Sequence, residues 1–200
     1  MSGVAKAGVT GSVEDAEDGE PATPPTGRSL YFTGPRSISI ERESVSAPGP
    51  DEVLVEARVS AVSSGTELLI YRGEMPRDLA ADATIDALGD DLSYPLKYGY
   101  ATVGEVVDLG PNVAERWRGR RVFAFNPHES HFAASPADLV PVPEDVSTTT
   151  AALLPTAETA TTLVMDGHPR VGERVVVFGA GMVGLVTTSV LSSFPLERLT

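Results

Sequence analysis

Cysteine is absent from this sequence of 200 residues, and both basic residues and long apolar runs are scarce. Without cysteine, neither a disulfide framework nor a zinc site built from thiolates can form. No apolar run approaches the roughly 20 residues that a membrane-spanning helix needs, and the N-terminus lacks the basic-then-apolar order of a secretory signal. We therefore expect a cytoplasmic protein that does not associate with a membrane.

The sequence also has few positively charged residues. Lys and Arg total 15 against 28 Asp and Glu, which gives a net charge of −13. A surface this negative repels phosphate backbones and anionic lipid headgroups, so nucleic acid is not an expected partner. The acidic residues are spread along the chain, which favours the acidic proteome of a salt-adapted cell over a functional acidic patch. The hydrophobic share of 42% is sufficient for a folded core.

The first three quarters of the chain predict a short tail followed by a mainly β domain. Residues 1–27 combine Gly, Ser, Ala and Pro with clustered acids, a composition typical of a disordered tail. Residues 53–61 alternate apolar and polar side chains, as in a strand with one buried face. Further strands are expected at residues 30–32, 37–40, 101–107, 121–125 and 139–142, and helices at residues 77–91 and at 147–165 with an interruption at Pro155.

The last part of the chain changes to an α/β pattern. Val175 to Phe178 form a continuous apolar run, which predicts a parallel strand buried on both faces. A helix is expected from Met182 to Ser193, where Phe194 and Pro195 end it, and a second strand from Leu196. A complete parallel sheet needs more strands than these residues supply, so we expect the domain to be truncated.

A glycine motif of the form GxGxxG joins the predicted strand to the predicted helix. Its first glycine permits the turn, its second lets the backbone approach a pyrophosphate, and its third allows close packing of helix and strand. The helix N-terminus would then face the phosphates. The expected cofactor is NAD or NADP, and the choice stays open because the discriminating residue lies at or beyond the last residues. The predicted cofactor-binding residues are Gly179, Gly181, Met182, Val183 and Gly184.

Several blocks of sequence resemble the medium-chain dehydrogenase/reductase superfamily. These are PGPDEVLVEARVSAVSSGTELLIYRGEMP, YPLKYGYATVGEVVDLG, RVFAF and LVPVPEDVS. The resemblance implies a mostly β, GroES-like barrel domain over residues 28–168 and the β-turn-α start of a Rossmann-type domain over residues 169–200. Among zinc-free members, the motifs SGTE, YRGEMP and YPLKYGY are most similar to the bacteriochlorophyllide dehydrogenase branch.

The resemblance also locates candidate catalytic residues. Ser64 and Tyr100 stand where zinc-dependent members have metal ligands, and the third ligand position falls near Pro155, so no metal site is expected. Thr66 occupies the position of the proton-relay hydroxyl. The predicted catalytic residues are therefore Thr66, Ser64 and Tyr100, each of which could instead bond only to local backbone. The same alignment places Thr159 near the nicotinamide.

The histidine-rich segment PHESHF, which begins at Pro127, has two imidazoles and a carboxylate but no distant third ligand. We expect it to line the substrate cleft or to pack, rather than to bind metal. The predicted function is zinc-free, NAD(P)-dependent interconversion of an alcohol and a carbonyl on a small-molecule substrate. Reduction of a quinone or enone remains open, as does a truncated, non-catalytic remnant that keeps the barrel. A full-length form could be a homo-oligomer.

Overall fold

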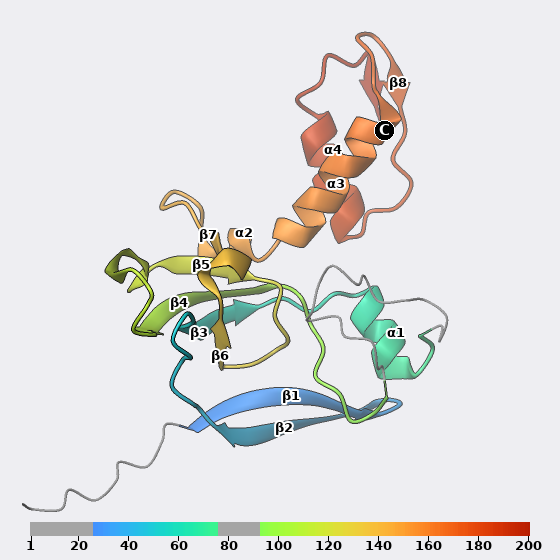
Figure 1. The fold of residues 1–200 in the computed structure, drawn as a ribbon. Coiled ribbons are helices and arrows are strands. Elements are labelled where there is room, and N and C mark those ends of the chain that lie inside the picture. Colours follow the sequence, from blue (N-terminus) through green and yellow to red (C-terminus); the bar gives the residue numbers. More distant parts are fainter. Residues whose placement is uncertain (1–25, 76–92) are drawn as a thin grey trace, which may run out of the picture.

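The computed structural model describes residues 26–75 and 93–200, and the first described element is a β-hairpin (Figure 1). Strand β1 (Thr26–Gly34) pairs antiparallel with β2 (Ser37–Ser44), in agreement with the strands expected there. The sequence assigns Thr26 and Gly27 to the tail, but both belong to β1. They pair with the end of β2, which satisfies their backbone groups. The helix predicted for residues 77–91 lies outside the described residues.

A second, five-stranded antiparallel sheet has the order β6-β3-β4-β5-β7. The strands expected at residues 53–61, 101–107, 121–125 and 139–142 are all present. Strand β6 was not predicted, because its four residues show neither alternation nor a β-branched side chain. The strands are β3 (Val53–Ser60), β4 (Thr102–Leu109), β5 (Arg121–Ala124), β6 (His131–Ala134) and β7 (Val140–Pro141).

The core of this sheet follows from the alternation in β3. Val53 and Val55 are fully buried and pack with Val106, Val122 and Phe132 from the neighbouring strands. Burial of such aliphatic side chains is the main favourable contribution to folding. This packed core holds the strands of the sheet together, and the surrounding loops are attached to their ends.

Helices connect the sheet to the C-terminal part of the chain. Helix α1 (Thr66–Arg72) follows β3, and the predicted interrupted helix is found as α2 (Thr148–Ala151) and α3 (Leu154–Gly167). Pro155 lies in the first turn of α3, where its missing N–H costs no hydrogen bond. Two short 3₁₀ helices, η2 (Glu115–Trp117) and η3 (Pro136–Asp138), complete the loops.

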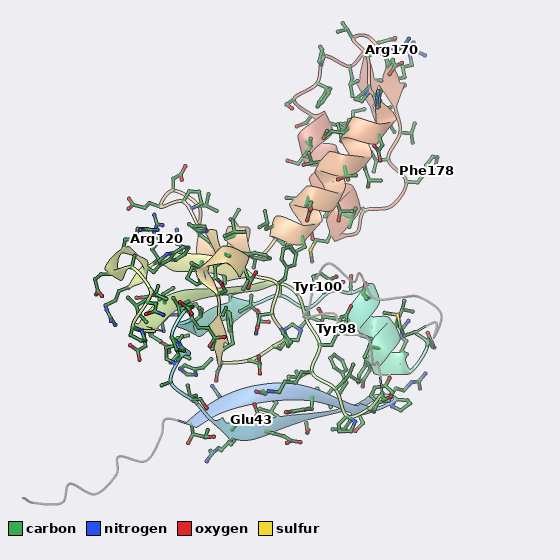
Figure 2. All side chains as sticks on the ribbon, in the orientation of Figure 1. Glu43, Tyr98, Tyr100, Arg120, Arg170 and Phe178 are labelled. Atoms are coloured by element: carbon green, nitrogen blue, oxygen red, sulfur yellow. The ribbon has the colours of Figure 1, made fainter. Side chains whose placement is uncertain are left out.

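The C-terminal unit consists of β8 (Arg174–Val175), α4 (Met182–Leu191) and β9 (Arg198–Leu199). The two strands pair in parallel, and α4 packs against α3. The prediction of a strand from Val175 to Phe178 buried on both faces is wrong in its extent and burial. Only Val175 belongs to β8, while Val176 is 54% and Phe178 94% exposed, and Figure 2 shows Phe178 pointing away from both helices.

The exposure of these side chains has a simple cause. A parallel strand is buried when other strands flank it and helices cover both faces. Within the described residues, β8 has β9 as its one strand neighbour. The same cause leaves Leu185, on the helix after Gly181, 60% exposed. In the described parts of the chain, no helix combines the length and the apolarity needed to cross a bilayer.

Candidate active site

A cleft of about 590 Å³ lies between the sheet and the C-terminal unit. Four segments form it: the turn after β3, the residues before β4, the start of α3 and the glycine-containing loop before α4. Within residues 26–75 and 93–200, every residue that lines the cleft is uncharged, although 22% of the whole sequence is charged. The cleft therefore offers hydroxyl groups, backbone groups and apolar side chains as contacts for a ligand.

The glycine motif forms one wall of this cleft. Gly179 has φ +104°, a conformation that glycine adopts without strain. A Cβ on Gly184 would lie 2.0 Å from the carbonyl oxygen of Gly179, so the helix can approach the loop only with glycine there. A Cβ on Gly181, the N-cap of α4, would meet nothing within 4 Å. The lining includes five of the six residues predicted to bind the cofactor, namely Gly179, Gly181, Met182, Val183 and Gly184, but not Thr159.

The opposite wall carries the predicted catalytic hydroxyls. Ser64 lies in the turn that leads from β3 into α1, Thr66 is the first residue of α1, and Tyr100 precedes β4. Antiparallel pairing of β3 with β4 brings these segments together, because Ser60 at the end of β3 pairs with Thr102 at the start of β4. All three predicted residues line the cleft. Their catalytic roles remain predictions.

Thr159 is not brought to the cleft. Its side chain is exposed on α3, and its Oγ1 donates to the backbone carbonyl of Pro155 at 2.9 Å. Thr156, one helical turn earlier, lines the cleft instead, and its Oγ1 contacts the Met182 sulfur at 3.4 Å. The placement of Thr159 beside a nicotinamide therefore finds no support in the geometry of α3.

A buried acid–imidazole pair, which no sequence pattern predicts, lies behind the turn. Glu67 Oε2 lies 2.8 Å from His128 Nε2, and the two side chains are 2% and 9% exposed. Glu67 belongs to the motif SGTE and His128 to PHESHF, but they are 61 residues apart in the chain. No local pattern pairs them. Within residues 26–75 and 93–200, no group of three or more His, Cys, Asp or Glu side chains is arranged to hold a metal ion.

Tyr98 is buried in an apolar cluster with Phe32, Ile70 and Leu96. Its ring meets the Tyr100 ring edge to face, with centroids 6.2 Å apart. Burial raises the pKa of Tyr98 to about 12, and the neighbouring Tyr100 and Glu67 contribute to the same shift. Tyr98 therefore remains protonated at neutral pH, and its uncharged side chain packs against the Tyr100 ring.

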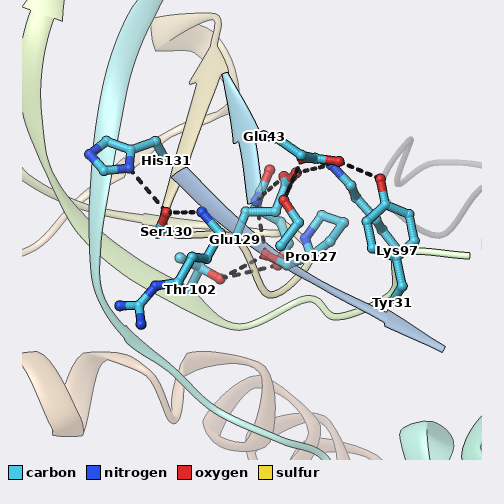
Figure 3. A network of polar contacts seen from close by, with 11 residues as sticks. Tyr31, Glu43, Lys97, Thr102, Pro127, Glu129, Ser130 and His131 are labelled. Carbon is cyan, nitrogen blue, oxygen red and sulfur yellow. Dashed lines mark hydrogen bonds and ion pairs between the residues drawn. The ribbon is translucent and has the colours of Figure 1, made fainter. Parts of the chain in front are cut away.

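A second polar network anchors the β1–β2 hairpin to the loop before β6 (Figure 3). Lys97 Nζ donates to Glu43 at 2.7 Å and to Glu129 at 2.6 Å. Hydrogen bonds from Lys97, Ser29 and Tyr31 lower the pKa of Glu43 to about 2. Although burial disfavours the charge on Lys97, its hydrogen bonds to Glu129 and Glu43 raise its pKa. Lys97 and Glu43 are thus both charged across the neutral range.

Comparisons with known proteins give relatives of one kind, although no family model matches the chain. A curated 2-desacetyl-2-hydroxyethyl bacteriochlorophyllide A dehydrogenase from Cereibacter sphaeroides is 34% identical over 113 residues, covering 56% of this chain and 30% of that protein. The crystal structure of the alcohol dehydrogenase RspB from Escherichia coli, complexed with NADH, matches with a TM-score of 0.70 at 19% identity, covering 87% of this chain and 56% of that one.

A putative zinc-binding dehydrogenase from Sinorhizobium meliloti, bound to NADP, matches with a TM-score of 0.69 at 16% identity over 88% of this chain and 55% of that one. The homologues and structural neighbours are alcohol-dehydrogenase-like oxidoreductases. The resemblance inferred from the residues is thereby confirmed. The chain spans 30% of the length of the curated relative and about half that of the two structures.

The network around Lys97 predicts how stability depends on pH. Because the pKa of Glu43 falls from 4.5 to about 2 on folding, its carboxylate stabilises the folded state above pH 4.5. This contribution is lost as the pH falls toward 2. We expect Glu43→Gln to lower the free energy of unfolding at pH 7 by about 1 kcal/mol or less, the range for partly exposed ion pairs, and to have no effect near pH 2.

Urea unfolding between pH 2 and pH 7 measures this difference. Glu41→Gln on the same strand is the control, because that side chain is exposed. An equal pH dependence for the two variants would contradict the assignment of acid sensitivity to Glu43.

Proposed function

We propose that this protein is an NAD(P)-dependent oxidoreductase of the medium-chain dehydrogenase/reductase type. It interconverts an alcohol and a carbonyl, or reduces an activated double bond, without catalytic zinc. The observation that carries the proposal is that the glycine loop and three hydroxyl side chains line the same cleft. In this proposal, residues 28–168 form a GroES-like domain and residues 169–200 begin a Rossmann-type domain.

The residues around α4 fit a dinucleotide. The open space beside Gly181 leaves room for a pyrophosphate to approach the backbone, and α4 begins immediately after it. The unpaired N–H groups at the start of a helix bind anionic oxygens, and the helix dipole favours negative charge there. When bound, the dinucleotide supplies or accepts the hydride. The protein's own contribution is to hold it against the wall that carries Ser64, Thr66 and Tyr100.

The same residues do not fit a catalytic zinc ion. Such a site needs three protein ligands of the His, Cys or carboxylate type. Ser64, Tyr100 and Thr156 present hydroxyl groups to the cleft. We therefore assign polarisation of the substrate oxygen and movement of its proton to these hydroxyls and to water, with Thr66 as the first candidate.

The substrate of the bacteriochlorophyllide dehydrogenase relative suggests a test compound. A hydroxyethyl side chain on a large ring presents a secondary alcohol within an apolar framework. The uncharged lining of the cleft is compatible with such a group. We propose substrates in which an alcohol or carbonyl is attached to an apolar ring or chain.

The exposed apolar side chains favour one alternative, a non-catalytic protein that keeps the GroES-like domain. Val176 and Phe178 lie beside the glycine loop and are 54% and 94% exposed. A wall this open excludes water poorly, which weakens electrostatic contacts to a ligand. Dinucleotide binding distinguishes the two functions.

Dinucleotide binding is expected to depend on Gly181. Gly181→Asp places a carboxylate in the space proposed for the pyrophosphate, and we expect it to weaken NADH or NADPH binding at least tenfold. Titration followed by nicotinamide fluorescence measures the affinity. Gly34→Asp is the matched control. A Cβ at Gly34 also meets nothing within 4 Å, and Gly34 belongs to the N-terminal hairpin rather than to the glycine loop. Absence of binding by the unmodified chain would support the non-catalytic alternative.

Metal analysis tests the absence of zinc. Protein purified without chelators should contain far less than one zinc ion per chain, because the described residues that line the cleft offer no imidazole, thiolate or carboxylate ligand. Inductively coupled plasma mass spectrometry gives the ratio of metal to protein. Stoichiometric zinc that survives dialysis would overturn this part of the proposal.

The proposed relay at Thr66 is tested by Thr66→Val, which removes the hydroxyl and keeps the shape of the side chain. We expect turnover of 2-desacetyl-2-hydroxyethyl bacteriochlorophyllide A with NAD or NADP to fall by about 100-fold, the lower range for loss of a proton-transfer group. Dinucleotide affinity should not change. Thr161→Val on the exposed face of α3 is the control. Unchanged turnover in the Thr66 variant would exclude the relay role.

A further inference from the structure

The loop from Asn126 to Ser130 is held in place by bonds to three other segments. The His128 carbonyl accepts from Leu30 N at 2.9 Å, and the Ser130 carbonyl accepts from Ala57 N at 2.8 Å. Thr102 Oγ1 donates to the Asn126 carbonyl at 3.1 Å. The backbone that carries His128 is therefore fixed by the hairpin and by two strands of the sheet.

His128 uses both ring nitrogens on this fixed backbone. Nε2 contacts Glu67, and Nδ1 is hydrogen-bonded to Ser60 Oγ at the end of β3. The ring also lies against Gly99, because a Cβ at that position would be 3.0 Å from Nε2. Gly99 has φ +144°, so glycine provides both the backbone conformation and the space for the imidazole. The orientation of His128 is thus determined from three sides.

Glu67 connects the fixed His128 ring to the turn that forms one wall of the cleft. Its side chain is 2% exposed, and each oxygen has a partner: Oε2 contacts His128, and Oε1 accepts from Ser63 N at 3.0 Å. A carboxylate buried this deeply is stable only when such partners replace water. Ser63 N–H begins the turn that presents Ser64 and Thr66 to the cleft.

We propose that Glu67 and His128 are positioning residues that fix the turn from Ser63 to Thr66 in the geometry required for its hydroxyls to act on the substrate. Neither residue lines the cleft, so neither touches the reacting atoms. The importance of the turn for catalysis rests on the proposed function, whereas its dependence on Glu67 and His128 can be measured without it.

Hydrogen exchange of the Ser63 amide, followed by NMR on the whole chain, tests the proposal directly. We expect Glu67→Ala and His128→Ala to speed this exchange at least tenfold relative to the Val55 amide in the central sheet. His128→Gln should restore most of the protection, since its side-chain amide can donate to Glu67. Ser60→Ala should leave the sheet intact and speed Ser63 exchange by a smaller factor. Equal acceleration of Ser63 and Val55 would show a merely structural role and overturn the proposal.

Two further measurements separate this inference from the proposed function. In the His128→Gln and Ser60→Ala proteins, NADH affinity should match that of the unmodified chain, because the glycine loop is untouched. If turnover is measurable, kcat should fall in the Ser60→Ala protein while the KM for the dinucleotide stays constant. If the alanine variants of Glu67 and His128 do not fold, the exchange of the Ser63 amide in the Ser60→Ala protein decides the question. The proposal is overturned if this variant does not speed Ser63 exchange relative to Val55 exchange. Failure of NADH binding with a selective Ser63 response contradicts the proposed function alone.

Discussion

The fixed loop from Asn126 to Ser130 is the constraint on which the arrangement of the candidate site depends. It is bonded to β1 through Leu30, to β3 through Ala57 and to β4 through Thr102. Its two charged or ionisable side chains point to different partners: Glu129 to Lys97, and His128 to Glu67. One short loop therefore connects the hairpin, the sheet and the turn of the cleft.

The two polar networks of this loop differ in their exposure. The ion pairs of Lys97 involve side chains that are 16 to 35% exposed, so water screens them and each contributes modestly to stability. The contact between Glu67 and His128 is almost completely buried. Loss of one partner there would leave a buried polar group without a hydrogen bond, which is costly. The buried pair is therefore better suited to fix a geometry than to add net stability.

The cleft combines one rigid wall with one open wall. Ser64, Thr66 and Tyr100 project from segments tied to the sheet, whereas the glycine loop belongs to a unit whose strand pairing is short and whose apolar side chains are exposed. Oriented hydroxyls on a rigid base suit proton transfer at a fixed position. Under the proposed function, a bound dinucleotide would complete the open wall.

The local patterns of the sequence determined most elements of the fold. Alternation predicted β3, Pro155 predicted the division between α2 and α3, and the spacing of glycines predicted the loop before α4. Each of these signals acts within about ten residues, where backbone conformation and side-chain periodicity are directly linked. The family resemblance added the hydroxyls of the cleft, and the structure brings these residues together.

Only the tertiary structure decided which distant residues meet and how far each apolar run is buried. Val176 and Phe178 are apolar side chains that favour burial. Whether they are buried depends on how many strands and helices pack around them, and both are exposed. The pairing of Glu67 with His128 arises because β3, β4 and the loop before β6 converge at one end of the sheet. A contact across 61 residues leaves no periodic trace in the sequence, since its energy depends on geometry that the whole fold supplies.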